Sequence, residues 1–257
     1  MSGTVTHIMT SLTTVTRAFE ILDLLWKLDG AGPTEIAAEL DVPNSTVYDY
    51  LESLTDTKFV SKEKGEYNIS AYFLTIAGRM RYRNRLFQLA QPEMRRLSEE
   101  TGELIGLTVE MGGVGVILHQ EGGDQALSLG TYPGASTPLH TVATGKAILA
   151  NLSEDRIDEI LDQRGLEART EHTITDPTRL KAELAEIRAD GYAVDWDEQV
   201  IGMGMIAVPI SVDTEVLGSI GIVVPTKRIQ DEAYQADLLD QLQEVQNTIT
   251  VNYQYGK

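Results

Sequence analysis

The short distance between two amphipathic segments constrains this chain more than any other feature. Residues 35–40 and 45–55 each place their apolar side chains at helical spacing. Thr34 and Asn44 are the expected N-caps of the two helices, and Asp41-Val42-Pro43 leaves room for a tight turn but not for a longer loop. Two helices joined in this way form a helix-turn-helix.

A third helix and a hairpin flank this pair. Residues 16–28 carry apolar side chains that we expect to form one buried stripe, namely Phe19, Ile21, Leu22, Leu24, Leu25 and Leu28. Residues 58–62 and 67–69 predict two short strands around a turn that contains Gly65. Residues 1–70 therefore predict a winged helix-turn-helix domain, whose third helix would enter the major groove of DNA.

The charge is distributed unevenly. Residues 1–85 carry 9 basic and 11 acidic side chains, a net charge of −2, whereas residues 86–257 carry 12 and 28, a net charge of −16. The N-terminal third could therefore approach DNA, and the remainder would be repelled by it. The total of −18 favours a halophilic source, and we expect an archaeon with a molar-salt cytosol. An acidic mesophilic protein kept soluble by its charge is the alternative.

Composition and motifs exclude several classes of protein. The chain has no cysteine, which excludes disulfides, thiolate zinc sites and a cysteine nucleophile. No apolar run approaches about 20 residues, and Met1–Thr13 lacks the basic and apolar regions of a signal peptide. We therefore expect a cytoplasmic protein without a membrane partner.

Residues 71–90 predict a single linker helix that contains four arginines, Arg79, Arg81, Arg83 and Arg85. Arg79 and Arg83 share one face, and Arg81 and Arg85 share another. These side chains could contact the DNA backbone, or they could pair with acids of the C-terminal domain or of a partner subunit. Pro92 fits the first turn of a further helix that ends at Thr101-Gly102.

Residues 91–257 predict a separate α+β domain. Strands are expected at residues 104–110, 114–121, 126–129, 192–195, 205–212 and 216–224. Helices are expected at residues 143–151, 154–163 and 231–250, and a further helix from Asp176-Pro177 to Gly191. This order is typical of an antiparallel sheet with helices packed against it.

Several sequence blocks together resemble the IclR-type transcriptional regulators. They are Arg17–Leu22, Thr34–Ala37, Pro43–Tyr48, Thr101–Glu103, Pro138–Ala147 and Gly191–Asp195, in the family's order and spacing from about Thr13 onward. The resemblance implies a homodimeric or tetrameric, sequence-specific DNA-binding regulator. Its C-terminal domain would be a GAF-like sensor with a six-stranded sheet that binds a small-molecule effector. A DNA-binding regulator or architectural protein without a ligand is the alternative.

The DNA-binding residues follow from the resemblance and from the residue types. Asn44 and Asp49 stand where the family usually has cations, so base-edge contacts would carry more of the affinity. Arg17, Lys62 and Lys64 are the candidates for phosphate contacts. The full set is Arg17, Thr34, Asn44, Ser45, Thr46, Tyr48, Asp49, Lys62 and Lys64. Asn44 could also be only a helix cap, and Asp49 only a solvated side chain.

The resemblance also implies an effector site between the sheet and the segment Ala143-Thr144-Gly145-Lys146. The matching positions are Ala126, Leu129, Ala143, Thr144, Asp195, Met205, Gly221 and Val223. Amides at the start of that helix would suit a carboxylate. The walls would be mostly apolar, with Thr144 and Asp195 as the polar side chains, which favours a larger or less polar effector than a keto acid. A packed core without a ligand is the alternative.

An enzyme is not expected. The segment around Thr144 lacks the first glycine and the final hydroxyl of a phosphate loop. The four histidines, His7, His119, His140 and His172, are not at metal-ligand spacing, and His140 is expected to be a structural hydrogen-bonding residue. We therefore expect no catalytic residue, metal or cofactor.

Overall fold

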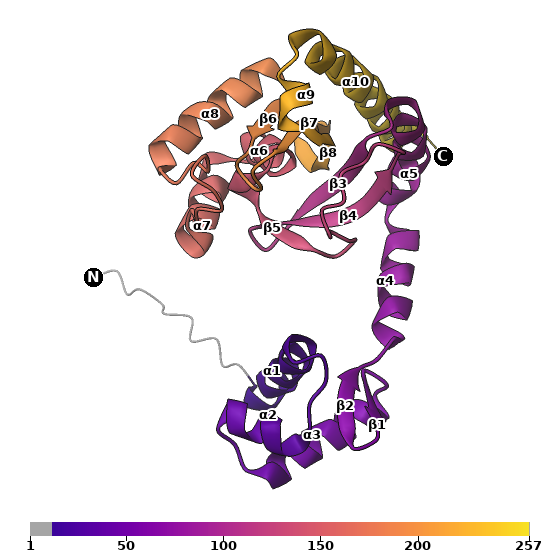
Figure 1. The fold of residues 1–257 in the computed structure, drawn as a ribbon, viewed down its shortest axis with the longest axis vertical. Helices are drawn as coiled ribbons and strands as arrows, with labels where there is room; N and C mark the ends of the chain where they lie inside the picture. Colours follow the sequence, from indigo (N-terminus) through magenta and orange to yellow (C-terminus); the bar gives the residue numbers. More distant parts are fainter. Residues whose placement is uncertain (1–11, 257) are drawn as a thin grey trace, which may run out of the picture. The chain divides into compact units, whose positions relative to one another are not determined.

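The computed structural model describes residues 12–256, which divide into two compact units. The first unit ends at Met80 and the second begins at Arg81 (Figure 1). Residues 1–11 lie outside the described part, as do His7 and most of the segment examined for a signal peptide. Within residues 12–256, no helix is both long and apolar enough to span a membrane.

The first unit is the predicted winged helix-turn-helix. Its elements are α1 (Thr13–Lys27), α2 (Pro33–Leu40), α3 (Asn44–Asp56), β1 (Val60–Glu63) and β2 (Glu66–Ile69). The hairpin turn is formed by Lys64 and Gly65, at φ of 52° and 96°. Two consecutive positive φ values are those of the tight turn that suits the twist of a hairpin.

The expected caps of α2 and α3 are wrong by one or two residues. Gly32 and Pro43 occupy the N-cap positions, and Thr34 and Asn44 lie inside the helices. The amides of Thr46 and Val47 donate to the carbonyl of Pro43. Proline has a fixed φ and no N–H to satisfy, so it is well suited to a helix start. Asn44 is therefore not a helix cap.

The buried stripe of α1 is narrower than expected. Ile21 and Leu25 are fully buried against α2 and α3, in the core that also holds Ile36, Val47 and Leu51. Phe19 is 66 % exposed and Leu28 is 36 % exposed. The six apolar positions span too wide an arc of the helix for one core to cover them all.

The linker consists of two helices, not one. α4 (Tyr72–Arg83) ends before Asn84, whose side chain accepts a hydrogen bond from the amide of Phe87 and caps α5 (Arg85–Thr101). Pro92 lies inside α5 and does not begin a new helix. Asn84 therefore separates the two helices. The sequence prediction missed it because Asn84 lies between Arg83 and Arg85 in a segment whose helical pattern continues.

The second unit is built on a six-stranded antiparallel sheet with the order β5-β4-β3-β8-β7-β6. Its strands are β3 (Leu104–Met111), β4 (Val114–Gly122), β5 (Ser136–Pro138), β6 (Ala193–Trp196), β7 (Met203–Val212) and β8 (Glu215–Pro225). The sixth strand is β5, whereas residues 126–129 form no strand. A run of four apolar-rich residues therefore gave the wrong location for an edge strand.

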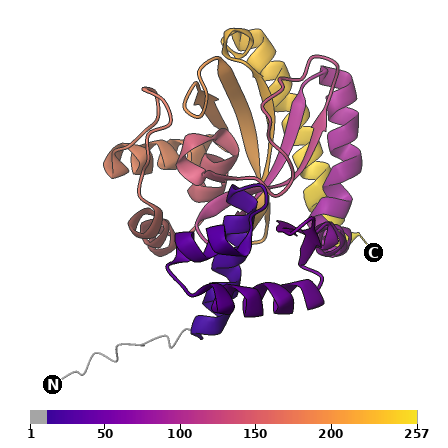
Figure 2. The same ribbon diagram turned by 60° about the horizontal axis from the view of Figure 1, so that its bottom comes forward.

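Helices cover both faces of this sheet (Figure 2). α5 and α10 (Glu232–Tyr255) lie side by side on one face, over a core that contains Ile105, Ile206 and Ile222. The other face of the sheet packs against a second core. The elements that form this core with the sheet are η1 (Leu139–Thr141), α6 (Ala143–Ala150), α7 (Glu154–Arg164) and α8 (Pro177–Asp190). The short helix α9 (Thr226–Ile229) precedes α10.

Candidate functional site

The exposed face of α3 carries most of the side chains expected to read DNA bases. Asn44, Ser45, Tyr48 and Asp49 are exposed, and Thr46 is half-buried. The opposite face is buried through Val47, Leu51 and Leu54. α3 contains no lysine or arginine, so this face presents hydroxyl, amide and carboxylate groups in place of cations.

The expected phosphate-binding cations differ in the contacts that their side chains make within the protein. Arg17 pairs with Glu20 at 3.0 Å and donates to the carbonyl of Leu40 at 3.4 Å, so it also ties α1 to α2. Lys62 lies over the ring of Tyr67, 4.8 Å from its centre, and this contact raises the pKa of the ammonium group. Lys64 is exposed at the hairpin turn, and Thr34 is exposed on α2.

The arginines around the α4–α5 joint fall into two groups. The guanidinium of Arg81 contacts His119, and that of Arg85 donates to the carbonyl of Gly256 at 2.6 Å. Within the described residues their partners are thus an imidazole and a carbonyl, and not acids of the C-terminal domain, which were one of the alternatives for these arginines. Arg79 and Arg83 are exposed.

A cavity of about 120 Å³ lies between the sheet and the start of α6. Four of the expected effector residues line it: Leu129, Thr144, Met205 and Val223. The hydroxyl groups of Thr108 and Thr144 meet across it at 3.2 Å. The other lining residues are Gly106, Thr108, Ile117, Gln120, Thr131, Ala135, Ser136, Thr137, Val142, Gln199 and Met203.

The other four expected residues do not line this cavity. Ala143 and Asp195 are fully buried, and Ala126 packs against the core on the same side of the sheet. Gly221 lies under Thr144, and a Cβ atom at Gly221 would come within 2.8 Å of Thr144 Cγ2. Gly221 therefore makes room for the threonine that faces the cavity.

The exposed surface of the cavity is mostly apolar, as expected, but most of its polar side chains are not the expected ones. Hydroxyl and amide side chains contribute to its wall, and Asp195 is not among the lining residues. Sequence reasoning missed Thr108, Gln120, Thr131, Ser136, Thr137 and Gln199. Alternation along the strand of residues 104–110 could have indicated Thr108, which lies two residues after Gly106 on the same face. It could not have indicated Gln120 together with Ile117, because the register shift in β4 places these two residues, three apart, on one face.

A group of buried charges lies beside the cavity. Lys146 is fully buried, and its Nζ lies 2.5 Å from carboxylate oxygens of Glu183 and Glu198. Burial alone would lower the pKa of Lys146, but the two glutamates raise it above its usual value. Burial raises the pKa of Asp195 to about 7, although its carboxylate accepts the amide hydrogen of Glu198 at 2.8 Å. A buried cation thus ties α6 to α8 and to the segment after β6.

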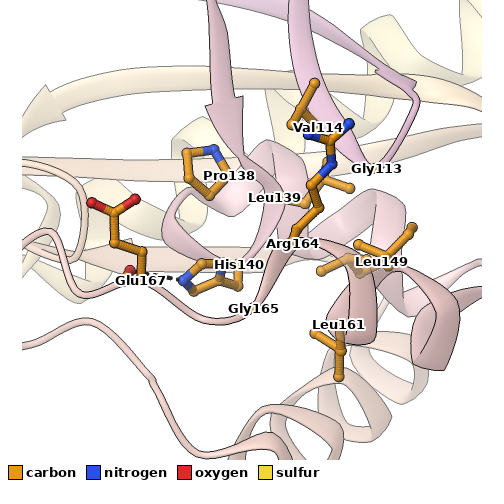
Figure 3. Close-up of a pocket in the computed structure, with 11 residues that line it drawn as sticks. Gly113, Val114, Pro138, Leu139, His140, Leu149, Leu161, Arg164, Gly165 and Glu167 are labelled. Atoms are coloured by element: carbon orange, nitrogen blue, oxygen red, sulfur yellow. Dashed lines mark hydrogen bonds between the residues drawn. The ribbon is translucent and has the colours of Figure 1, made fainter.

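A second hollow, of about 180 Å³, lies between η1, α7 and the β3–β4 turn (Figure 3). His140 lines it and bonds through Nε2 to the carbonyl of Glu167 at 3.0 Å. Nε2 is the donor because a carbonyl oxygen only accepts, and burial lowers the pKa of the His140 ring. His140 thus has the structural role that the sequence predicted.

Within residues 12–256, no cluster of three His, Asp or Glu residues could hold a metal ion.

Two family models cover this architecture. Residues 14–64 match the IclR helix-turn-helix domain, and residues 80–251 match the C-terminal domain of bacterial transcriptional regulators of the IclR type. The chain belongs to the IclR family. It is therefore a DNA-binding transcriptional regulator with a C-terminal effector-binding domain, and not an enzyme.

Two relatives and one solved structure are similar to this IclR-family chain over most of its length. It is 33 % identical to the HTH-type transcriptional regulator BhcR of Paracoccus denitrificans, over 86 % of this chain and 80 % of that one. It is 28 % identical to the probable HTH-type transcriptional regulator ArcR of Halobacterium salinarum, over 93 % of both chains. An IclR homologue of Microbacterium hydrocarbonoxydans, solved in complex with 4-hydroxybenzoate, shares the fold with a TM-score of 0.80 at 21 % identity, over 94 % of this chain and 99 % of that one.

Proposed function

We propose that two copies of this chain bind a palindromic duplex through α3 and the wing, and that a small molecule in the cavity beside α6 changes the affinity for that duplex. The observation that carries the proposal is the exposed row of Asn44, Ser45, Tyr48 and Asp49 on α3. Hydroxyl, amide and carboxylate groups can read base edges in the major groove. Residues 1–70 would be the reading domain, 71–90 the linker and 91–257 the effector domain.

A dimer is supported by an apolar row, formed by α1 and by Leu12 just before it, that the first unit leaves uncovered. Leu12, Val15, Phe19 and Trp26 are between 51 and 73 % exposed, at spacings of three, four and seven residues. This is the spacing at which one helix packs along another. Phe19→Ser with Trp26→Ser should shift the protein from dimer, or tetramer, toward monomer in sedimentation velocity. An unchanged sedimentation coefficient would place the dimer contact elsewhere.

The cavity supports a small effector that has an apolar body and a few polar groups. Thr108, Thr144 and Gln120 offer hydroxyl and amide groups, and the amides at the start of α6 suit a carboxylate. The solved homologue with 4-hydroxybenzoate has the same fold, which supports a ligand of comparable kind. Ala126, Ala143, Asp195 and Gly221 would act by shaping the lining.

High salt is the expected working condition, in the cytoplasm of a halophilic archaeon. The net charge of −18 and the similarity to a Halobacterium regulator support this. In molar salt the Debye length is about 3 Å, so missing cations on α3 cost little affinity. Base contacts would then carry most of the specificity.

The deciding experiment is selection from random duplex DNA by the purified chain, in molar and in 0.1 M potassium chloride. We expect a palindrome to be enriched at molar salt. Asn44→Ala should weaken binding to it by about 1–3 kcal/mol, whereas Asn247→Ala, at an exposed asparagine of α10 in the second unit, serves as the matched control. Failure to enrich any sequence at either salt, with the folded protein, would overturn the proposal.

A further inference from the structure

Arg81, in the last turn of α4, is held by strand β4. Its Nη2 lies 2.6 Å from His119 Nδ1, and its guanidinium lies over the ring of Phe87, 4.6 Å from the centre. Arginine only donates, so Nδ1 of His119 accepts and Nε2 carries the proton. Nε2 then donates to Glu121 at 2.8 Å. His119 is 9 % exposed, and its ring edge meets Phe87.

The next residue of β4 faces the cavity. Gln120 pairs with Gly106 across the sheet, and both line the cavity. His119 pairs with Leu107, on the opposite face, which packs against α5. Because successive side chains of a strand point to opposite faces, two adjacent residues connect the cavity wall to the end of α4. A register shift between Leu107 and Thr108 interrupts the strand pair at this place.

The contact lies next to the joint between two helices. α4 ends at Arg83, and the amide of Asn84 donates to the carbonyl of Arg81 at 3.0 Å before α5 begins. A change at His119 therefore reaches both the side chain and the backbone carbonyl that precede the joint. α4 begins at Tyr72, directly after the wing in the sequence, so its position bears on the DNA-reading domain.

We propose that Arg81 and His119 are the positioning residues through which occupancy of the cavity changes the placement of α4 and hence DNA affinity. The inference rests on the proposed function, in which that cavity holds the effector. A ligand against Gln120 displaces β4, His119 moves with it, and Arg81 carries the displacement to the last turn of α4. Coupling of this kind requires a contact that differs between the two states.

The cavity can be filled without knowing the effector. A Cβ atom at Gly106 would meet nothing within 4 Å, and the backbone there needs no positive φ. Gly106→Val therefore introduces methyl groups into the cavity beside Gln120. The measurements are the Kd for the selected duplex, by fluorescence anisotropy, and hydrogen exchange of the amides of residues 76–83 in the full chain. Both measurements are made on four backgrounds, namely wild type, Arg81→Met, His119→Phe and Arg79→Met. Each background is measured once with Gly106 and once with Gly106→Val.

Arg79→Met is the matched control, because it removes the same charge from an exposed position of the same helix. We expect Gly106→Val to change the Kd by about fivefold or more in the wild-type and Arg79→Met backgrounds. With Arg81→Met or His119→Phe the change should fall below about twofold, and the exchange of residues 76–83 should no longer respond. His119→Asn, which keeps an acceptor for Arg81, should retain the response and shows that the fold is intact.

Two results would overturn the inference. One is an equal change of Kd in all backgrounds, which would mean that the signal bypasses Arg81. The other is no change of Kd on filling the cavity of the otherwise wild-type protein. In both cases the duplex is still bound, so the DNA-reading function stands, whereas a chain that enriches no duplex fails at the proposed function instead.

Discussion

The hydroxyl of Thr108 on β3 donates to the hydroxyl of Thr144 at the start of α6, and both side chains are at most 4 % exposed. This hydrogen bond links the sheet to α6 at the cavity wall. Its geometry leads to the first prediction. Thr144→Val keeps the shape of the side chain and leaves the Thr108 hydroxyl without this partner, which costs about 1–3 kcal/mol of unfolding free energy.

Urea unfolding of the two single variants and of the double variant Thr108→Val/Thr144→Val measures this bond. The double variant should recover part of the loss, because no polar group is then left without a partner. A double variant that loses the sum of the two single effects would show that the bond contributes little.

The second prediction concerns the space under Thr144. Gly221→Ala should destabilise the second unit by about 1–3 kcal/mol, because a Cβ atom there lies 2.8 Å from Thr144 Cγ2 and 3.0 Å from the carbonyl oxygen of Ile206. Thr144→Ser removes the first of these clashes and should restore part of the stability. The midpoint of thermal unfolding measures both, and a Gly221→Ala variant as stable as wild type contradicts the tight contact.

The sequence predicts the fold of the first unit well because its signals are local. Pro43, the apolar spacing of α3 and the turn at Gly65 each act within a few residues. It predicts the linker poorly, because one capping residue, Asn84, decides between one helix and two. Periodicity continues across that residue and hides the break.

The cavity is only partly predictable, for a different reason. Thr144, Met205 and Val223 follow from the resemblance, whereas Gln199 and Ser136 lie in loop or edge segments whose position depends on the whole sheet. The partners of Lys146 are equally non-local, since Glu183 and Glu198 lie 37 and 52 residues away. Nothing in the spacing of the sequence indicates a buried lysine held by two glutamates.

The third prediction tests that lysine. Lys146→Met should cost about 3–5 kcal/mol of unfolding free energy, because Glu198 then stays buried without its cation. Lys181→Met is the matched control, since Lys181 and Asp158 form an exposed pair whose loss should change the unfolding free energy little. Urea unfolding at neutral pH compares them, and equal losses would show that the Lys146 pairs add nothing beyond a surface contact.

The fourth prediction is a pH dependence from Asp195. Burial raises its pKa from 3.8 to about 7, so below pH 4 both the folded and the unfolded chain hold the proton. As the pH rises from 4 to 7 the unfolded chain releases it first, and the stability that this group contributes is lost. Asp195→Asn stays neutral and can still accept the Glu198 amide. Its stability relative to wild type should therefore rise between pH 4 and pH 8, by at most about 4 kcal/mol.

Urea unfolding at pH 4, 6 and 8 measures this rise for Asp195→Asn, with the exposed Asp155→Asn on α7 as the control. Asp155→Asn should show no comparable rise, because its side chain remains in solvent. A difference between Asp195→Asn and wild type that is constant over the three pH values would show that folding does not raise the pKa of Asp195.

The fifth prediction separates phosphate contacts from base contacts on the selected duplex. Lys64 has a φ of 52°, a conformation that asparagine tolerates, so Lys64→Asn removes the charge without straining the hairpin. If Lys64 contacts a phosphate, the slope of log K against log salt should become shallower by about 1, with little change in sequence preference. Asn44→Ala should do the reverse, relaxing the preference at one base position while the slope stays the same. Titrations between 0.2 and about 2 M potassium chloride measure both, and an unchanged slope for Lys64→Asn would show that the wing lysine is only solvated.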